Sequence, residues 1–426
     1  MSVQWLIVGG GVHGVHIAAR LLGEGGVEPD QLRIVDPGTR LLERWRALSA
    51  TTGMKHMRSP SVHHLDVAPS SLRRFAGRAK RHTPGLFARP YERPSLALFN
   101  EHCEHVLDAF ELEKLHIQGR VVACSVECDG VRVELAEGQR VIAGRVVLAI
   151  GASEQPQWPL WAPRHDARVQ HIFDRGFNGW PSSSQQTLCV VGGGISAGQV
   201  TLRLLKQGHR VHLVSRHALR VHQFDSDSGW LGPRNMTGFR RERDVNRRRE
   251  IITQARHRGS MPPDVQRALS LAISQGRLSW HEGEVSGAFI SDSDVTLRLN
   301  TGDVVRAGRV LLATGFTSRR PGGAWVDQLI ESASLPCARC GYPIVDASLR
   351  WHPRVHVSGP LAELELGPVA RNIAGARRAG DRLVDVALGG PVFDTTPGAP
   401  DPGGASHHPV RGGHPEGSAA SAVAAV

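Results

Sequence analysis

The chain has 426 residues, of which 40% are hydrophobic and 21% are charged, a composition typical of a globular protein with two or three domains. No stretch approaches the ~18 apolar residues that span a bilayer, and the early apolar run at residues 5–8 argues against a signal peptide. The six cysteines are too few for a disulfide scaffold, so we expect a cytoplasmic protein.

The formal net charge of +11 comes from arginine, since only Lys55, Lys80, Lys114 and Lys206 are lysines. Basic proteins often bind nucleic acid. Here the arginines are spread along the chain, and acidic residues interrupt the densest run, at residues 234–258. We therefore expect a solvated helix face or a site for an anionic small molecule there, and no nucleic-acid surface.

Residues 4–36 predict a strand, a glycine-rich turn, a helix and a second strand that ends at Asp36. Gly9, Gly11 and Gly14 have the G-x-G-x-x-G spacing, which permits a tight turn, close approach of a pyrophosphate to the backbone and close helix packing. The N-terminus of the helix favours the anion. Asp36 follows where a carboxylate accepts hydrogen bonds from ribose hydroxyls and repels a 2′-phosphate. This unit therefore predicts binding of FAD or NAD, not NADP.

Residues 187–216 repeat the plan, with alanine at the last position of the fingerprint. The loop residues expected to contact the cofactor are Gly192, Gly194, Ser196 and Ala197. The second strand of this unit ends at Ser215 and Arg216, where a hydroxyl and a guanidinium suit a 2′-phosphate. NADPH is therefore the expected ligand. The alternative for Arg216 is an ordinary solvated strand end.

Two further turns complete an ordered set of landmarks, because apolar strands end in an Ala-Ile-Gly turn at Gly151 and an Ala-Thr-Gly turn at Gly315. This order resembles that of the flavoproteins with paired FAD and NAD(P)H domains. The resemblance implies an α/β fold with two Rossmann-like dinucleotide-binding domains, the second inserted in the first. The expected ranges are 1–165 and 320–388 for the FAD-binding domain, 166–319 for the NADPH-binding domain, and 389–426 for a disordered tail rich in Gly, Pro, Ala and Ser.

Cysteine positions favour one branch of these flavoproteins. The disulfide reductases need a redox cysteine pair, but residues 37–102 contain no cysteine and the second domain contributes only Cys189. The chain instead resembles the FAD monooxygenases that bind NADPH, above all the ornithine and lysine N-hydroxylases. Trp45 together with residues 57–61 resembles their flavin-flanking segment, and residues 359–368 resemble their last FAD motif.

The resemblance implies an FAD-dependent, NADPH-using monooxygenase that hydroxylates a small nucleophilic substrate, most often an amine nitrogen, through a flavin C4a-hydroperoxide. Its partners would be a small-molecule substrate and O2, and a homo-oligomer is left open. One alternative is an NAD(P)H-dependent flavin oxidoreductase that passes electrons to a quinone or a protein. Another is a non-catalytic FAD-binding redox sensor. No catalytic side chain is assigned, because the flavin performs the difficult steps.

The expected cofactor-binding residues are Gly9, Gly11, Gly14, Asp36, Trp45, Val122, Gly151, Gly192, Gly194, Ser196, Ala197, Ser215, Arg216, Gly315, Gly359 and Gly367. His63 and His64, beside the flavin-flanking segment, are candidate substrate residues. Asp225 and Asp227 are candidate partners of a substrate amine.

A cysteine and histidine pattern comes close to zinc-finger spacing, formed by Cys337, Cys340, His352 and His356. A finger needs both histidines on one helix face, but Pro353 separates them and the surrounding residues alternate like a strand. We therefore expect ordinary strand and loop residues and no metal. A redox role of the two cysteines is left open.

Overall fold

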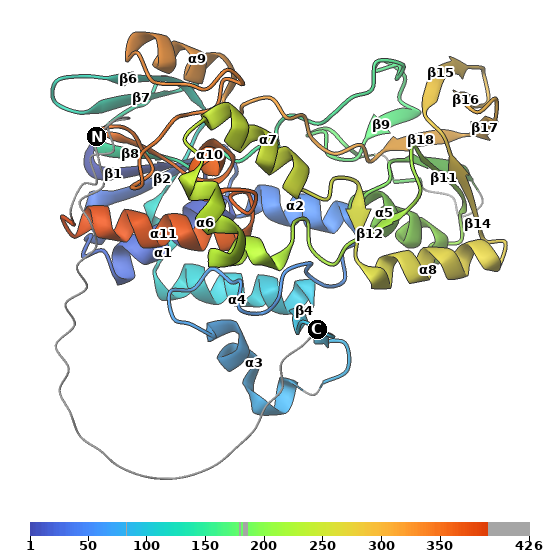
Figure 1. Ribbon diagram of the computed structural model, residues 1–426, viewed down its shortest axis with the longest axis horizontal. Coiled ribbons are helices and arrows are strands. Elements are labelled where there is room, and N and C mark those ends of the chain that lie inside the picture. The colour runs from blue at the N-terminus through green and yellow to red at the C-terminus, as the bar shows by residue number, and fades with distance from the viewer. Residues whose placement is uncertain (82, 179, 182–185, 391–426) are drawn as a thin grey trace. The chain divides into compact units, whose positions relative to one another are not determined.

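The computed structural model describes residues 1–81, 83–178, 180–181 and 186–390 (Figure 1). Of the expected disordered tail, residues 391–426 lie outside the described residues. Within the described part of the chain, no helix combines the length and apolar character needed to cross a bilayer.

The first sheet has the strand order β19-β20-β8-β1-β2-β5, and β7 pairs with β8 and β6. Its strands are β1 (Ser2–Val8), β2 (Leu32–Asp36), β5 (His116–Gln118), β6 (Val121–Val126), β7 (Val131–Leu135), β8 (Arg140–Leu148), β19 (Arg350–His352) and β20 (Val355–Val357). The central strands β20, β8, β1, β2 and β5 are parallel. Parallel strands buried on both faces are nearly continuous in apolar residues, as Leu6, Ile7 and Val8 of β1 illustrate.

Two helices from opposite ends of the described chain cover this sheet together. Helix α1 (Val12–Gly23) follows the first glycine loop, and α11 (Ile373–Ala387) packs along it (Figure 1). The close approach depends on the absence of a side chain at Gly380 of α11, because a Cβ there would lie 3.1 Å from the His16 ring of α1. The C-terminal part of the chain therefore completes the N-terminal domain.

The second sheet is parallel throughout and has the order β14-β11-β10-β18-β9. Its strands are β9 (Val169–His171), β10 (Thr187–Val191), β11 (Arg210–Ser215), β14 (Leu278–Glu282) and β18 (Arg309–Leu312), with helices α5 (Ile195–Lys206) and α8 (Pro263–Ser274). An antiparallel meander, β15 (Val285–Ile290), β16 (Val295–Leu299) and β17 (Val304–Ala307), precedes β18. All these strands fall between β8 and β19 in the chain, which confirms the expected α/β fold with the second Rossmann-like unit inserted in the first.

The remaining elements lie in the connections. The helices are α2 (Glu43–Thr52), α3 (Ser71–Arg81), α4 (Leu96–Ala109), α6 (Pro233–Arg241), α7 (Val245–Ala255), α9 (Gly323–Ser332) and α10 (Glu363–Leu366). Two-residue strands form the pairs β3 (Phe87–Ala88) with β4 (Arg93–Pro94) and β12 (Arg220–Val221) with β13 (Ser260–Met261). Helix α4 begins where Ser95 Oγ accepts a hydrogen bond from the Leu98 amide at 3.2 Å, an N-cap of the usual kind.

Candidate cofactor and active site

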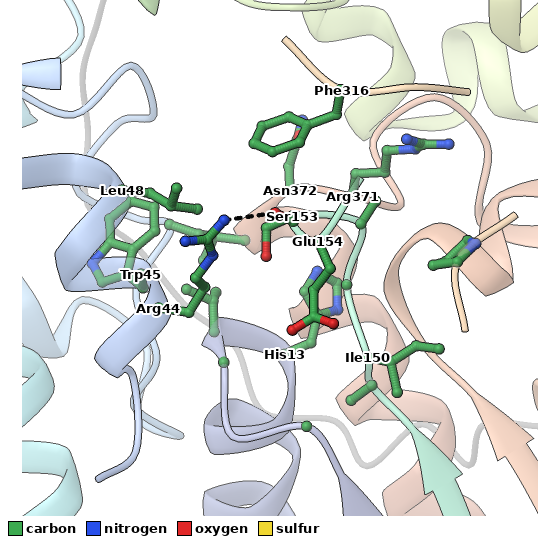
Figure 2. A pocket seen from close by; sticks show the side chains of 18 of the residues that line it. His13, Arg44, Trp45, Leu48, Ile150, Ser153, Glu154, Phe316, Arg371 and Asn372 are labelled. Carbon is green, nitrogen blue, oxygen red and sulfur yellow. Dashed lines mark hydrogen bonds between the residues drawn. The ribbon is translucent and has the colours of Figure 1, made fainter. Parts of the chain in front are cut away.

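A cavity of about 1140 Å³ lies at the carboxyl ends of the parallel strands, where α/β folds bind their ligands. Its lining includes the first glycine loop at residues 8–13, the start of α2, and residues 149–155 after β8. Residues 224–228 and the first residues of α5 add a wall from the second unit. The two dinucleotide-binding units therefore contribute to one continuous cavity, part of which Figure 2 shows.

The first glycine of each loop has a positive φ angle. Gly9 has φ +114° and Gly192 has φ +150°, conformations that L side chains rarely adopt. A Cβ on Gly9 would lie 2.4 Å from the carbonyl oxygen of Ala149, and one on Gly192 would lie 2.5 Å from that of Ala313. Each loop is thus pressed against the turn that follows a neighbouring strand.

Asp36 is fixed at the edge of the cavity by the backbone. Its Oδ2 accepts a hydrogen bond from the Gly10 amide at 2.7 Å, and its Oδ1 accepts one from the Gly38 amide at 2.8 Å. Each carboxylate oxygen keeps a further lone pair for a ligand. The carboxylate is therefore oriented before any ribose hydroxyl reaches it.

Ser215, the last residue of β11, and Arg216, which follows it, differ in how freely their side chains can bind a ligand. Ser215 is buried, and its hydroxyl donates to the His217 carbonyl at 2.9 Å while it accepts from Trp280 Nε1 at 2.9 Å. Arg216 is exposed, and no ion pair involves it among the described residues. The expected contact of Ser215 with a 2′-phosphate thus conflicts with its two internal hydrogen bonds, whereas Arg216 remains available.

The other residues expected at the cofactor fall into two groups. Those that line the cavity are Gly9, Gly11, Asp36, Trp45, Gly151 and Ser196. Those that shape turns or helix contacts without lining it are Gly14, Gly192, Gly194, Ala197, Gly315, Gly359 and Gly367. Trp45 is held by a 3.1 Å hydrogen bond from Nε1 to Asn100 Oδ1.

Two residues that the sequence predicts at the site do not line the cavity, but the residue next to each of them does. Val122 is 45% exposed and faces away, whereas its neighbour Val121 lines the cavity, because successive side chains of a strand alternate between faces. His64 is fully buried with its ring centroid 5.3 Å from that of His102, and only His63 of the histidine pair reaches the cavity.

Arg44, in the first turn of α2, lines the cavity but was not among the residues predicted from the sequence. Its Nη2 donates to the carbonyl oxygens of Ser153, at 2.8 Å, and Phe173, at 2.7 Å. Figure 2 shows this guanidinium pointing toward Ser153, with Trp45 on the same helix. Burial lowers the pKa of Arg44, although the side chain keeps its charge because an arginine pKa starts near 12.5. No local sequence signal marks Arg44, because its partners lie far away in the chain.

Asp225 and Asp227 both line the cavity, but only one of them is neutralised by an arginine. Asp225 accepts from Asn372 Nδ2 at 3.0 Å and lies 3.4 Å from Arg256 Nη2. Asp227 is 75% exposed and has His257 Nε2 at 3.2 Å from its Oδ1. Of these two carboxylates, Asp227 is therefore the one whose charge is not already balanced by an arginine, and it is the better partner for a cationic ligand.

A buried ion cluster supports the start of α11 beside the cavity. Glu363 is 1% exposed and pairs with Arg249 and Arg371, the latter at 2.6 Å. Burial alone would raise the pKa of Glu363, but hydrogen bonds and charge from the two arginines lower it. The hydroxyl of Tyr342 accepts from Arg371 Nη2 at 2.9 Å. The cluster fixes the backbone just before Asn372, which lines the cavity.

The four residues with zinc-like spacing lie in two different settings. Cys337 precedes a turn that contains Cys340, and Arg249 Nε lies 3.4 Å from Cys340 Sγ. His352 and His356 lie on the hairpin of β19 and β20, and His356 is buried beside Trp5. Among the described residues, no group of three or more His, Cys, Asp or Glu side chains is arranged to hold a metal ion.

Comparisons with known proteins agree with this architecture. Residues 6–153 match a family model described as FAD-NAD(P)-binding. No match was found among curated protein sequences. The family match covers the first glycine loop, Asp36 and the turn at Gly151.

Solved structures extend the likeness to nearly the whole chain. The Kutzneria sp. 744 ornithine N-hydroxylase, described with reduced FAD, NADP+ and L-ornithine, has a TM-score of 0.72 at 18% identity over 91% of this chain and 99% of that one. The cadaverine monooxygenase of Erwinia amylovora, bound to FAD, has a TM-score of 0.71 at 15% identity over 94% and 100%. The bacillithiol disulfide reductase of Bacillus cereus has a lower TM-score of 0.60 at 16% identity over 91% and 99%. The chain therefore shares the fold of these structures, with two dinucleotide-binding units of which the second is inserted in the first.

Proposed function

We propose that the chain is an FAD-dependent, NADPH-using monooxygenase that hydroxylates the nitrogen of a small amine. The observation that carries this proposal is the single cavity shared by both dinucleotide-binding units, since a hydride passes only between rings held in contact. The similarity to N-hydroxylases over nearly the full length supports the same reaction class.

The residues present fit a flavin dinucleotide. The amides at the start of α1 suit the pyrophosphate, and the oriented carboxylate of Asp36 suits the ribose of the adenosine half. The start of α11, beside Asn372, provides a second helix N-terminus at the cavity. Bound there, the flavin would accept a hydride and then activate O2. Arg216 is the proposed partner of the NADPH 2′-phosphate.

One carboxylate of the cavity, that of Asp227, supports an amine as the substrate. Arg58 lines the cavity, but its Nε donates to the Gln223 carbonyl at 2.9 Å and its Nη2 to the Phe224 carbonyl at 2.7 Å. Asp227 has no arginine partner among the described residues, so its carboxylate attracts a cation. We propose that Asp227 binds a charged group of the substrate and that His63 borders the same space.

One atom of O2 enters the hydroxylamine and the other leaves as water. An amine, O2, NADPH and one proton give a hydroxylamine, water and NADP+, so NADPH supplies two of the four electrons that reduce O2 and the amine nitrogen supplies the other two. The new bond is N–O, and the nitrogen loses one proton. The cavity walls contribute by keeping bulk water from the reacting centre.

The test is a coupling measurement with FAD-loaded protein, NADPH and a panel of amines with and without a carboxylate. We expect one amine to give hydroxylamine in near-stoichiometric amounts to the NADPH consumed. Asp227→Asn should raise KM for that amine by about tenfold, because a charge-assisted contact is lost, while the NADPH affinity stays unchanged. Asp292→Asn, a matched change outside the cavity, should alter neither value.

Two outcomes would select another function. Fast NADPH consumption that requires a quinone or a protein acceptor, with no oxygenated product from any amine, would indicate the oxidoreductase. Tight FAD binding without reduction by NADPH would indicate the redox sensor.

A further inference from the structure

His13 occupies an unusual place in the first glycine loop, and this inference rests on the proposed binding of FAD. It is the second residue of α1, between Gly11 and Gly14, and it lines the cavity (Figure 2). Loops of this kind bind a pyrophosphate with backbone amides and need no side chain there. An imidazole at this point is therefore an added group with hydrogen-bonding capacity.

One ring nitrogen of His13 is already held by the protein. Nδ1 lies 2.8 Å from the hydroxyl oxygen of Ser358, a fully buried residue that follows β20. Gly359 comes next and leaves room for the ring, since even a Cβ on it would lie 3.7 Å from the imidazole. The orientation of the ring is therefore set by the last strand of the first sheet.

The other ring nitrogen is held less firmly. Nε2 is buried, and no group among the described residues forms a hydrogen bond of good geometry with it, although the backbone of Arg371 and Asn372 comes close to the ring on the same cavity wall. Buried polar atoms without partners are rare in native proteins, and each one calls for a bound water, an ion or a ligand. Because the residue lines the cavity, the missing partner belongs to whatever fills that space.

The ring is neutral at neutral pH, so one of its nitrogens donates and the other accepts. Burial lowers the pKa of His13 to about 4, although the backbone of Arg371 and Asn372 opposes this shift. A neutral imidazole carries one proton, and a Ser358 hydroxyl that donates to Nδ1 leaves this proton on Nε2. Nε2 is then a donor, which suits a phosphate or hydroxyl oxygen.

We propose that His13 Nε2 donates a hydrogen bond to the pyrophosphate–ribityl chain of bound FAD and so positions the cofactor at the start of α1. Ser358 is the residue that aims the ring. His16, one turn further along the same helix, has a different role, because it is fully buried, does not line the cavity and bonds through Nδ1 to the Leu65 carbonyl at 2.7 Å.

The test compares FAD dissociation constants of apoprotein carrying His13→Leu, His13→Gln or His16→Gln, together with phosphorus NMR of the bound cofactor. We expect His13→Leu to weaken FAD binding by about tenfold or more and to shift a pyrophosphate resonance. His13→Gln retains a donor and should recover most of the affinity. His16→Gln should lower the thermal stability of the apoprotein but leave the FAD affinity and both resonances unchanged.

Several outcomes would overturn this assignment. Wild-type FAD affinity and unchanged phosphorus resonances in His13→Leu would assign the Nε2 partner to water. Equal losses in both His13 variants, in proportion to lost apoprotein stability, would make the residue purely structural. If His13→Leu does not fold, the wild-type protein offers a second test. A chemical shift of His13 Nε2 in isotope-labelled protein that does not change when FAD is added would also refute the contact. Wild-type protein that binds no FAD would instead refute the proposed function.

Discussion

The two dinucleotide-binding units share a backbone plan but differ in how firmly the protein holds the polar side chains that could bind a ligand. In the first unit, Asp36 is held by two amides and His13 by Ser358, so the polar groups at the cavity are fixed in advance. In the second unit, the Ser215 hydroxyl is used internally and Arg216 extends into solvent. Preorganisation lowers the entropic cost of binding. The contrast suits a cofactor that stays bound in the first unit and a dinucleotide that exchanges in the second.

The largest effect on FAD binding and stability is expected from adding a side chain at Gly14 in the first glycine loop. A Cβ on Gly14 would lie 1.8 Å from the Gly9 carbonyl oxygen, a distance that real contacts never reach, so Gly14→Ala must displace the loop. We expect loss of FAD binding and a destabilisation of several kcal/mol, measured by flavin titration and urea unfolding. Gly238→Ala in α6 is the matched control, because a Cβ there meets nothing within 4 Å and should add about 0.5–1 kcal/mol of stability. FAD binding by Gly14→Ala at wild-type affinity would contradict the account.

A second prediction concerns acid sensitivity of the first unit. Burial lowers the pKa of the fully buried His16 and His64 to about 3 and that of His102 to about 4. The unfolded chain binds these protons near pH 6.5, so the native state is stabilised above this pH and loses stability as the pH falls toward 4. Each histidine contributes a slope of about 1.4 kcal/mol per pH unit in that window.

Urea unfolding at several pH values between 7.5 and 5 would measure this slope. His64→Leu should reduce it by about one histidine's share, because neither ring nitrogen of His64 has a hydrogen-bond partner among the described residues. The second unit contributes a fully buried histidine, His171 of β9, whose pKa burial lowers to about 4, whereas His212 and His281 are only partly buried. A free energy of unfolding that does not change below pH 6.5 would refute the prediction.

The smallest expected effects are those of substitutions at Ser215 and Arg216, and they distinguish the roles of these two residues at the end of β11. Arg216→Ser should raise the KM for NADPH by about tenfold and leave that for NADH nearly unchanged, because a surface guanidinium–phosphate contact is lost. Ser215→Ala should leave the preference for NADPH intact and cost about 1 kcal/mol of stability, because Trp280 Nε1 loses its acceptor. Loss of NADPH preference in Ser215→Ala alone would reverse these assignments.

The sequence sufficed for features encoded in short segments. The glycine fingerprints and Asp36 follow from spacing and periodicity, the insertion of the second unit was implied by the resemblance to paired-domain flavoproteins, and the structure confirms this fold. Val122 and His64 were misplaced by one position, because spacing does not tell which of two neighbours faces the cavity. Arg44 and Asn372 could not be found, because their hydrogen bonds join segments more than a hundred residues apart.

The central claim is that the two dinucleotides meet in one cavity, and anaerobic mixing of FAD-loaded protein with NADPH tests it most directly. The account predicts that NADPH bleaches the oxidised-flavin absorbance in a saturable, single-phase reaction, and that NADH does so only at higher concentration. Bound FAD that stays oxidised in the presence of saturating NADPH would contradict the claim.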